Sequence, residues 1–222
     1  MQTALAHNRS MYFAINLALI ACAYLLGSLS GSLLLGRLRG VDIRTQGSGN
    51  AGGTNALRTQ GWKFALGVVL IDIGKGALAA WLALRFAPTS GGLPTLSVAY
   101  LAVIAAAIGH VWPLWHGFRG GKGVGTLLGG VLVLWPTAVP WLLLAWLLVL
   151  VGTGYVGLAS VIAVACLVPL ALINNVDTAR LLFASVAALL VLYTHRGNVQ
   201  RLRAGSEPRF ERVRLLRRRR RT

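Results

Sequence analysis

The stretch GHVWPLWHGFRGGKGVGT, residues 109–126, lies between two long apolar runs and contains two histidines, one arginine, one lysine and six glycines. The apolar runs on either side of it have almost no charge of their own. This contrast predicts that apolar helices hold the polar stretch, together with two companion loops, at one face of a membrane.

Glycines surround the basic pair of this stretch, Arg119 and Lys122. Gly120, Gly121 and Gly123 permit left-handed backbone angles and close approach, so that consecutive N–H groups can point at one anion. The Lys122 ammonium adds a full positive charge, which suits a phosphate-bearing ligand. Nucleotide hydrolysis is disfavoured, because Gly123 stands where a serine or threonine would hold magnesium. A flexible, positively charged turn is the alternative, and this stretch alone does not decide between the two.

The composition is that of an integral membrane protein, since 56% of the 222 residues are hydrophobic and the mean hydropathy is +0.68. Only five acidic residues oppose 22 lysines and arginines, and eleven of the arginines follow His195. Such a basic tail is expected to lie against anionic lipid headgroups on the cytoplasmic side. Nucleic-acid binding is not expected, because the arginines follow a membrane domain and lack interleaved aromatic residues.

The apolar runs predict an all-α integral membrane protein with seven transmembrane helices. The runs span residues 12–35, 64–84, 93–107, 127–151, 155–173 and 179–193. Pro136 and Pro140 divide the fourth run into two short helices, whereas the first run is expected to stay as one uncleaved helix. If the fourth run is a single helix and the last one only skims the interface, the count is five. One arginine precedes the first run and three follow it, so the positive-inside rule places the N-terminus outside and the C-terminus in the cytoplasm.

A second anion cradle is predicted in the first polar loop, residues 36–61, which contains QGSGNAGGTNALR at positions 46–58. Its glycines free the backbone, its short neutral side chains offer hydrogen bonds, and Arg58 can grip a phosphate through two parallel bonds. A flexible linker has a similar composition. However, a linker would seldom place asparagine, threonine and arginine at helical spacing just before an apolar helix.

Two further polar groups lie in or beside apolar runs. Asp72 and Lys75 share one face of a helix and can pair, and charges at that depth indicate either a functional site or an ion pair that locks helices together. His195 and Asn198, in THRGNVQRL at residues 194–202, share a face if the last helix continues through them. A lone histidine at a helix exit is more often an interfacial residue or a cap.

These motifs together resemble the bacterial acyl-phosphate:glycerol-3-phosphate acyltransferases of the PlsY type. The resemblance rests on GSGNxGxTNxxR at 47–58, DxxKG at 72–76, GHxxP at 109–113, FxGGKGVxT at 118–126 and HxxNxxRL at 195–202. The order of the motifs, their spacing and the apolar framework between them agree along the length of the chain. The arginine-rich tail departs from the family pattern.

The resemblance implies that a fatty acyl group passes from acyl phosphate to the 1-hydroxyl of sn-glycerol 3-phosphate. The products are 1-acyl-sn-glycerol 3-phosphate (lysophosphatidate) and phosphate, in the first acylation of phospholipid synthesis. It also implies seven transmembrane helices in the bacterial inner membrane, an active site facing the cytoplasm, and no cofactor, metal, acyl-CoA or acyl-carrier protein. Residues 1–195 would form the transmembrane acyltransferase domain, with cytoplasmic loops 36–61 and 109–126, and residues 196–222 the rest of the third motif and a basic tail.

The family pattern also suggests roles for individual residues. The residues expected to bind glycerol phosphate and orient its hydroxyl are Ser48, Arg58, Lys122, His195 and Asn198. Further substrate-binding residues are expected at Gly47, Gly49, Asn50, Gly52, Thr54, Asn55, Lys75, His110, Gly120, Gly121, Gly123 and Thr126. Both substrates carry phosphate, which explains why the polar loops offer cations and glycines but almost no carboxylates.

Two questions stay open at the level of sequence. The proton of the attacking hydroxyl can pass to His195 or to a substrate phosphate oxygen, and we favour the phosphate with His195 as a positioning group. The alternative function is a membrane transporter of an organic phosphate, in which the same cradles bind and release the anion. Metal-dependent phosphatidyl transfer is excluded by the dispersed carboxylates, and the acyltransferases with His and Asp five positions apart are excluded because no histidine here has that partner.

Overall fold

The computed structural model describes residues 2–89 and 93–210, and every regular element in these residues is a helix. The prediction of an all-α protein is therefore confirmed for the described part of the chain. The prediction for the basic tail falls mainly on residues 211–222, which lie outside the described residues.

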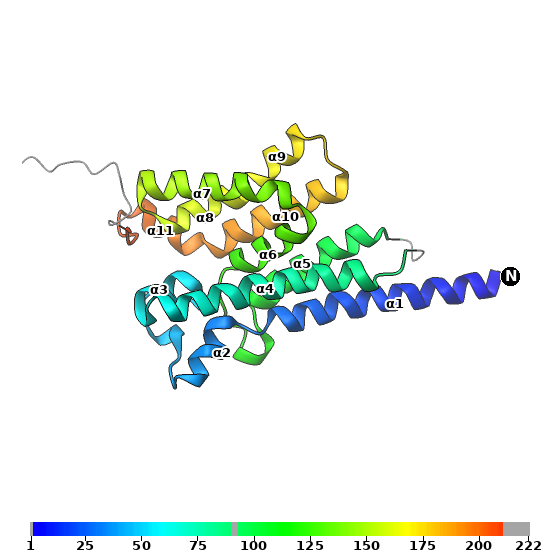
Figure 1. The fold of residues 1–222 in the computed structure, drawn as a ribbon, viewed down its shortest axis with the longest axis horizontal. Helices are drawn as coiled ribbons and strands as arrows, with labels where there is room; N and C mark the ends of the chain where they lie inside the picture. Colours follow the sequence, from blue (N-terminus) through cyan, green and yellow to red (C-terminus); the bar gives the residue numbers. More distant parts are fainter. Residues whose placement is uncertain (1, 90–92, 211–222) are drawn as a thin grey trace, which may run out of the picture.

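The helices follow the apolar runs, with short helices added in the polar segments. They are α1 (Gln2–Gly27), α2 (Gly31–Leu38), α3 (Gly53–Gln60), α4 (Trp62–Phe86), α5 (Thr95–Val111), α6 (Val124–Leu134), α7 (Val139–Thr153), α8 (Val156–Ala165), α9 (Leu167–Ile173), α10 (Thr178–Thr194) and α11 (Arg196–Arg203). Three 3₁₀ helices lie at Ile43–Thr45 (η1), Leu114–His116 (η2) and Pro136–Ala138 (η3). Figure 1 shows α3 and α11 at the same end of the molecule and the N-terminus at the opposite end.

The described helices provide five or six candidate membrane spans, by length and composition. The five are Arg9–Gly27, Trp62–Phe86, Thr95–His116, Pro136–Thr153 and Val156–Ile173. The sixth is formed by α10 and α11 together, which are bent by 56° relative to one another, and α6 is apolar but only 11 residues long. The predicted interruption of the run 127–151 is confirmed, because η3 separates the end of α6 from the start of α7.

The first apolar run, predicted as one helix, is instead broken at residues 28–30, between α1 and α2. Gly27 ends α1 at a point where the backbones of α1 and α5 touch, since a Cβ at Gly27 would clash with the carbonyl oxygen of Ala106. Such small residues allow helices to approach closely within a bilayer. The prediction was wrong because the small residues GSLSGS at positions 27–32 lie inside one apolar run, and the run was interpreted as a single helix although glycine and serine clusters also favour turns.

The charged pair of α4 supplies hydrogen-bond partners for the backbone at this break. The Lys75 ammonium donates to the carbonyl oxygens of Gly27 at 2.9 Å and Leu29 at 3.1 Å. The Asp72 carboxylate accepts the backbone N–H of Gly31, at the start of α2, at 3.2 Å. An interrupted helix inside a membrane needs such partners, because no water is there to replace the lost helical bonds.

Helix α4 also packs directly against α6 through glycine. A Cβ at Gly76 of α4 would clash with the carbonyl oxygen of Thr126, and a Cβ at Gly129 of α6 would clash with that of Ile73. The two backbones are therefore in contact at two places, about one helical turn apart. This contact holds the start of α6, which follows the polar stretch 109–126, against the middle of the bundle.

Replacing Gly76 with alanine should lower the thermal stability of the purified protein. The added methyl group meets the α6 backbone, and overpacking of this kind destabilises by about 1–3 kcal/mol. Gly74→Ala, two residues away on the same helix, is the matched control, because no atom lies within 4 Å of a Cβ there and alanine favours helix. The melting temperatures of both variants are measured by thermal unfolding in detergent. Equal melting temperatures for the two would contradict the close packing of α4 on α6.

Candidate active site

The first polar loop is shaped by the buried side chain of Asn55, at the start of α3. Its Oδ1 accepts the backbone N–H of Ser48 at 2.9 Å, and its Nδ2 donates to the carbonyl oxygens of Ile43 at 3.1 Å and Gln46 at 3.0 Å. Gly47 has a φ of 55°, in the left-handed region, and a Cβ there would clash with Asn55. Asn55 thus fixes the turn that presents Ser48 on the surface of the loop.

The other predicted residues of this loop lie at or near its surface. Ser48, Gly49 and Arg58 are exposed, and three more are half-buried: Asn50, Gly52 and Thr54. Within the described part of the chain, their side chains form no hydrogen bond to the second or third motif. Arg58, on α3, instead reaches the C-terminal segment, where its guanidinium lies 5.6 Å from the ring centroid of Phe210.

The second polar loop folds back onto the end of α5. The backbone N–H groups of Gly120 and Gly121 donate to the carbonyl oxygens of Val111 and His110, both at 3.1 Å. These two N–H groups are therefore already hydrogen-bonded within the protein and do not point at a free anion site. The absence of side chains at the two glycines instead allows the loop backbone to lie close to its neighbours. A Cβ at Gly121 would clash with the His110 ring and lie 2.9 Å from the carbonyl oxygen of Ala51. The first and second loops thus touch at Gly121.

Lys122 and Gly123 follow directly and lead into α6. Gly123 has a φ of 82°, in the left-handed region, and α6 begins at the next residue. The free N–H groups of the first turn of a helix, together with a nearby ammonium, favour an anion. The hydroxyl of Thr126, in this first turn, is buried and has no hydrogen-bond partner among the described residues.

Lys122 joins the second motif to the third. Its ammonium donates to Oδ1 of Asn198, and its carbonyl oxygen accepts the hydroxyl of Thr194 at 3.2 Å. Asn198 Nδ2 in turn donates to Glu207 at 2.6 Å. The sequence separates Lys122 from Asn198 by 76 residues, so this contact is decided by the tertiary fold.

His195 lies at the bend between α10 and α11 and is 3% exposed. Its Nδ1 lies 2.8 Å from the carbonyl oxygen of Val191. A carbonyl only accepts hydrogen bonds, so Nδ1 carries the proton and a neutral ring keeps its lone pair on Nε2. His195 and Asn198 therefore belong to one helical turn, as the sequence predicted if the helix continued, although the helix axis changes direction at His195.

Glu207 is a part of the site that the sequence reasoning missed. Its buried carboxylate accepts hydrogen bonds from Asn198 and, at 2.7 Å, from Nε of Arg201. It thereby orients the Asn198 amide, whose oxygen then faces Lys122. The available signal was weak, because a glutamate within an arginine-rich segment looks like an ordinary surface charge.

The site is strongly positive. Burial, and then the neighbouring guanidinium of Arg201, lower the pKa of Lys122 to about 8; Glu207 opposes this effect and Arg58 adds to it. Arg58 and Arg201 are thus each close enough to influence Lys122 electrostatically. Positive charges held this close together repel one another, and a bound anion such as a phosphate dianion would stabilise them.

Lys75 and His110, also predicted to bind substrate, lie behind the second loop. The Lys75 ammonium is 2.8 Å from His110 Nδ1 and 3.0 Å from the Asp72 carboxylate, and all three side chains are buried. They form one ionic cluster beneath Gly121. These contacts lie within the protein, and binding of substrate by Lys75 and His110 stays a prediction.

The chain is similar to known proteins along most of its length. The sequence model of the family described as glycerol-3-phosphate acyltransferase matches residues 17–205. A glycerol-3-phosphate acyltransferase of Clostridioides difficile (strain 630) is 45% identical over 186 residues, covering 83% of this chain and 90% of that protein. Another, of Synechococcus sp. (strain CC9902), is 45% identical over 197 residues, covering 88% and 95%.

Two crystal structures of PlsY (YgiH), an integral membrane glycerol 3-phosphate acyltransferase, have the same fold. The glycerol 3-phosphate form has a TM-score of 0.81 and 36% sequence identity, covering 88% of this chain and 95% of that one. The lysophosphatidic acid form has a TM-score of 0.79 and 35% identity, with the same coverage. By its sequence along most of its length and by its fold, this chain belongs to the glycerol-3-phosphate acyltransferase family.

Proposed function

We propose that this protein transfers a fatty acyl group from acyl phosphate to the 1-hydroxyl of sn-glycerol 3-phosphate, forming lysophosphatidate and phosphate. The contact of Lys122 with Asn198 carries the proposal, because it joins the second and third motifs in one cation-rich site. The two related crystal structures are the glycerol 3-phosphate form and the lysophosphatidic acid form of PlsY. The alternative of an organic-phosphate transporter finds no support among the relatives, which are named acyltransferases.

In this proposal the phosphate of glycerol 3-phosphate binds between Arg58 and Lys122. The Lys122 ammonium then exchanges its bond to Asn198 for a charge-assisted bond to phosphate, which is stronger. Asn198 and the Nε2 lone pair of His195 hold the acceptor hydroxyl, and Ser48 adds a neutral hydrogen bond. The loop glycines admit the acyl phosphate, whose acyl chain lies between helices and enters from the lipid.

The reaction needs no covalent enzyme intermediate, because acyl phosphate is already activated. The glycerol hydroxyl oxygen attacks the carbonyl carbon, the carbonyl oxygen becomes an oxyanion, and the bond from the carbonyl carbon to the phosphate oxygen then breaks. Orientation of the two substrates and donors aimed at the oxyanion lower the barrier. The hydroxyl proton passes to a substrate phosphate oxygen, whose second pKa is about 6; direct transfer to His195 is the alternative.

The topology is part of the same proposal. We place seven crossings in a bacterial inner membrane, with α6 and α10 as spans in addition to the five long ones, and the site at the cytoplasmic face. Residues 1–195 then form the transmembrane domain with loops 36–61 and 109–126, and residues 196–222 complete the third motif and form a basic tail. The cluster of arginines after the first span supports this orientation.

Lys122→Ala and Arg58→Ala should each abolish acyl transfer while the protein stays folded, because each removes one side of the phosphate clamp. Lysophosphatidate formation by purified protein in lipid is the measurement. Lys63→Ala is the matched control, since Lys63 is an exposed lysine at the start of α4 and should keep wild-type turnover. Near-normal turnover in Lys122→Ala or Arg58→Ala would defeat the clamp assignment.

The activity should fall on the alkaline side as Lys122 loses its proton. Below its pKa of about 8 the ammonium is charged and attracts phosphate, and above that pH it is neutral. The value of kcat/KM for glycerol 3-phosphate should therefore decrease as the pH rises through about 8, because kcat/KM reports groups of the free enzyme. The activity that remains in Lys122→Arg should lack this decrease. A flat wild-type profile across this pH range is the contrary result.

The acyl donor can be identified by a direct comparison. Protein supplied with glycerol 3-phosphate should form lysophosphatidate from a fatty acyl phosphate and not from acyl-CoA with the same chain. Lys122→Ala is the background control for both donors. Equal rates with the two donors would refute acyl phosphate as the dedicated donor but leave acyl transfer to glycerol 3-phosphate intact.

A further inference from the structure

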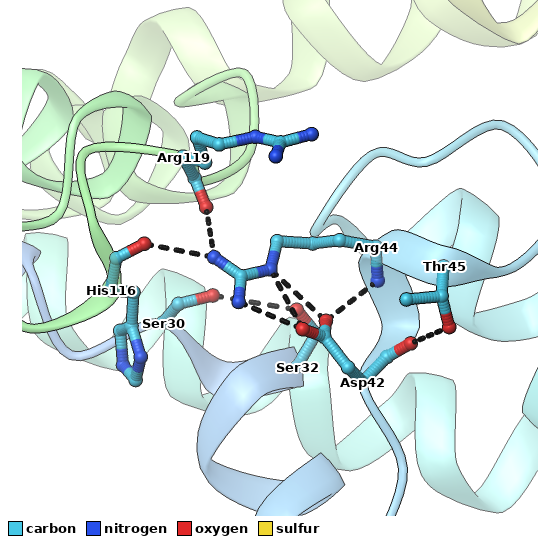
Figure 2. Close-up of polar contacts among 7 residues, drawn as sticks. All are labelled: Ser30, Ser32, Asp42, Arg44, Thr45, His116 and Arg119. Atoms are coloured by element: carbon cyan, nitrogen blue, oxygen red, sulfur yellow. Dashed lines mark hydrogen bonds and ion pairs between the residues drawn. The ribbon is translucent and has the colours of Figure 1, made fainter.

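Arg44 connects the first polar loop to the second. Its Nη1 donates to two backbone carbonyl oxygens of the second loop, that of His116 at 2.8 Å and that of Arg119 at 3.2 Å (Figure 2). Arg44 lies in η1, four residues before Ser48, and Arg119 directly precedes the glycine pair that leads to Lys122. The guanidinium thus joins the backbone just before Ser48 in the first loop to the backbone just before Gly120 in the second loop.

Asp42 holds this guanidinium in place. Its carboxylate accepts Nε of Arg44 at 3.0 and 3.2 Å and Nη2 at 2.8 Å, and it also accepts the Arg44 backbone N–H at 2.9 Å. Two parallel bonds between a guanidinium and a carboxylate fix the plane of both groups. The hydrogen bond from the Arg44 side chain lowers the pKa of Asp42, so Asp42 stays ionised at neutral pH.

The two bonds from Arg44 are the only hydrogen bonds that the described residues form between the segments 36–61 and 109–126. Another contact between the two segments, Gly121 against Ala51, is van der Waals packing. Packing sets how closely the loops approach, whereas directional bonds set how far one can slide along the other. Arg44 therefore controls the degree of freedom that Gly121 leaves open.

The Arg44 guanidinium is not placed to bind substrate phosphate itself. Nε, Nη1 and Nη2 all donate to protein oxygens. In Figure 2 Arg119 is joined to Arg44 through its carbonyl oxygen, and no hydrogen bond is drawn from the Arg119 guanidinium. Arg44 and Asp42 are partly exposed, with side chains 24% and 42% accessible, and exposed ion pairs add little to stability. The Arg44–Asp42 pair therefore positions the two loops, and it neither adds much to stability nor supplies a charge that binds the ligand.

We propose that Arg44, oriented by Asp42, is a positioning residue that sets the register between the Ser48 loop and the Lys122 loop, and hence between the two substrates. The inference rests on the proposed acyl transfer. A small displacement of reacting groups lowers the rate steeply, because catalysis here depends on orientation. The effect should therefore appear in kcat, whereas loss of a phosphate ligand would appear in KM.

Arg44→Lys tests this, because lysine keeps the charge but has no planar fork to bridge a carboxylate and two carbonyls. We expect kcat to fall by about 10- to 100-fold, with KM for glycerol 3-phosphate changed by less than about threefold. Arg37→Gln is the matched control: Arg37 is an exposed arginine beside the same pocket as Arg44, and its loss should leave kcat unchanged. Wild-type kcat in Arg44→Lys would overturn the proposal, as would a rise confined to KM.

Amide hydrogen exchange gives a readout independent of activity. In Arg44→Lys the amides of residues 112–121 should exchange faster than in wild type, with no change in α7 or α8. Asp42→Asn should have the same effect to a smaller extent, and the double variant should be no worse than Arg44→Lys, because the two residues form one unit. Two results would contradict the proposal: unchanged amide exchange in both single variants, or an increase in exchange in the double variant equal to the sum of the two single increases. Absence of acyl transfer in the wild type would instead contradict the proposed function.

Discussion

The buried ion pair of α4, Asp72 with Lys75, is the contact on which the rest of the structure depends. Each residue is 5% exposed, and together they satisfy the backbone where the first apolar run is interrupted and reach His110 at the end of α5. Charges buried in this way are tolerated only when each one is fully bonded. Four helices, α1, α2, α4 and α5, are therefore tied together beneath the second loop. The starting points of the first and second loops are thereby fixed relative to each other.

Glycine makes the close approach around this cluster possible. Gly27, Gly76 and Gly129 bring helix backbones into contact, and Gly121 lies between the His110 ring and the first loop. In a membrane, where apolar side chains gain little by leaving lipid, such backbone contacts are a main source of helix association. The same residue type thus serves packing within the bundle and the approach of the loops at the site.

Electrostatics then decides what the site can bind. Arg58, Lys122 and Arg201 gather at one end of the bundle, and Glu207 compensates part of their charge while it orients Asn198. A site of this kind favours phosphate over neutral ligands. The proposed transfer between two phosphorylated substrates would also require that the two polar loops be held in register. The hydrogen bonds from Arg44 to the backbone of the second loop are the contacts that we propose for this role.

The sequence by itself determined the apolar helices, the interruption of residues 127–151 at its prolines, the three polar motifs and the family, because hydropathy, proline and glycine act locally. It did not reveal the break at 28–30, the role of Glu207 or the bridge made by Arg44. The break and the bridge depend on partners far away in the chain, since Lys75 and Gly27 are 48 residues apart and Arg44 and His116 are 72. Glu207 bonds to Asn198 only nine residues away, but Asn198 joins the site through Lys122, which is 76 residues from it. Only the packing of helices decides which freed carbonyl or amide meets which side chain, so only the tertiary structure contains that information.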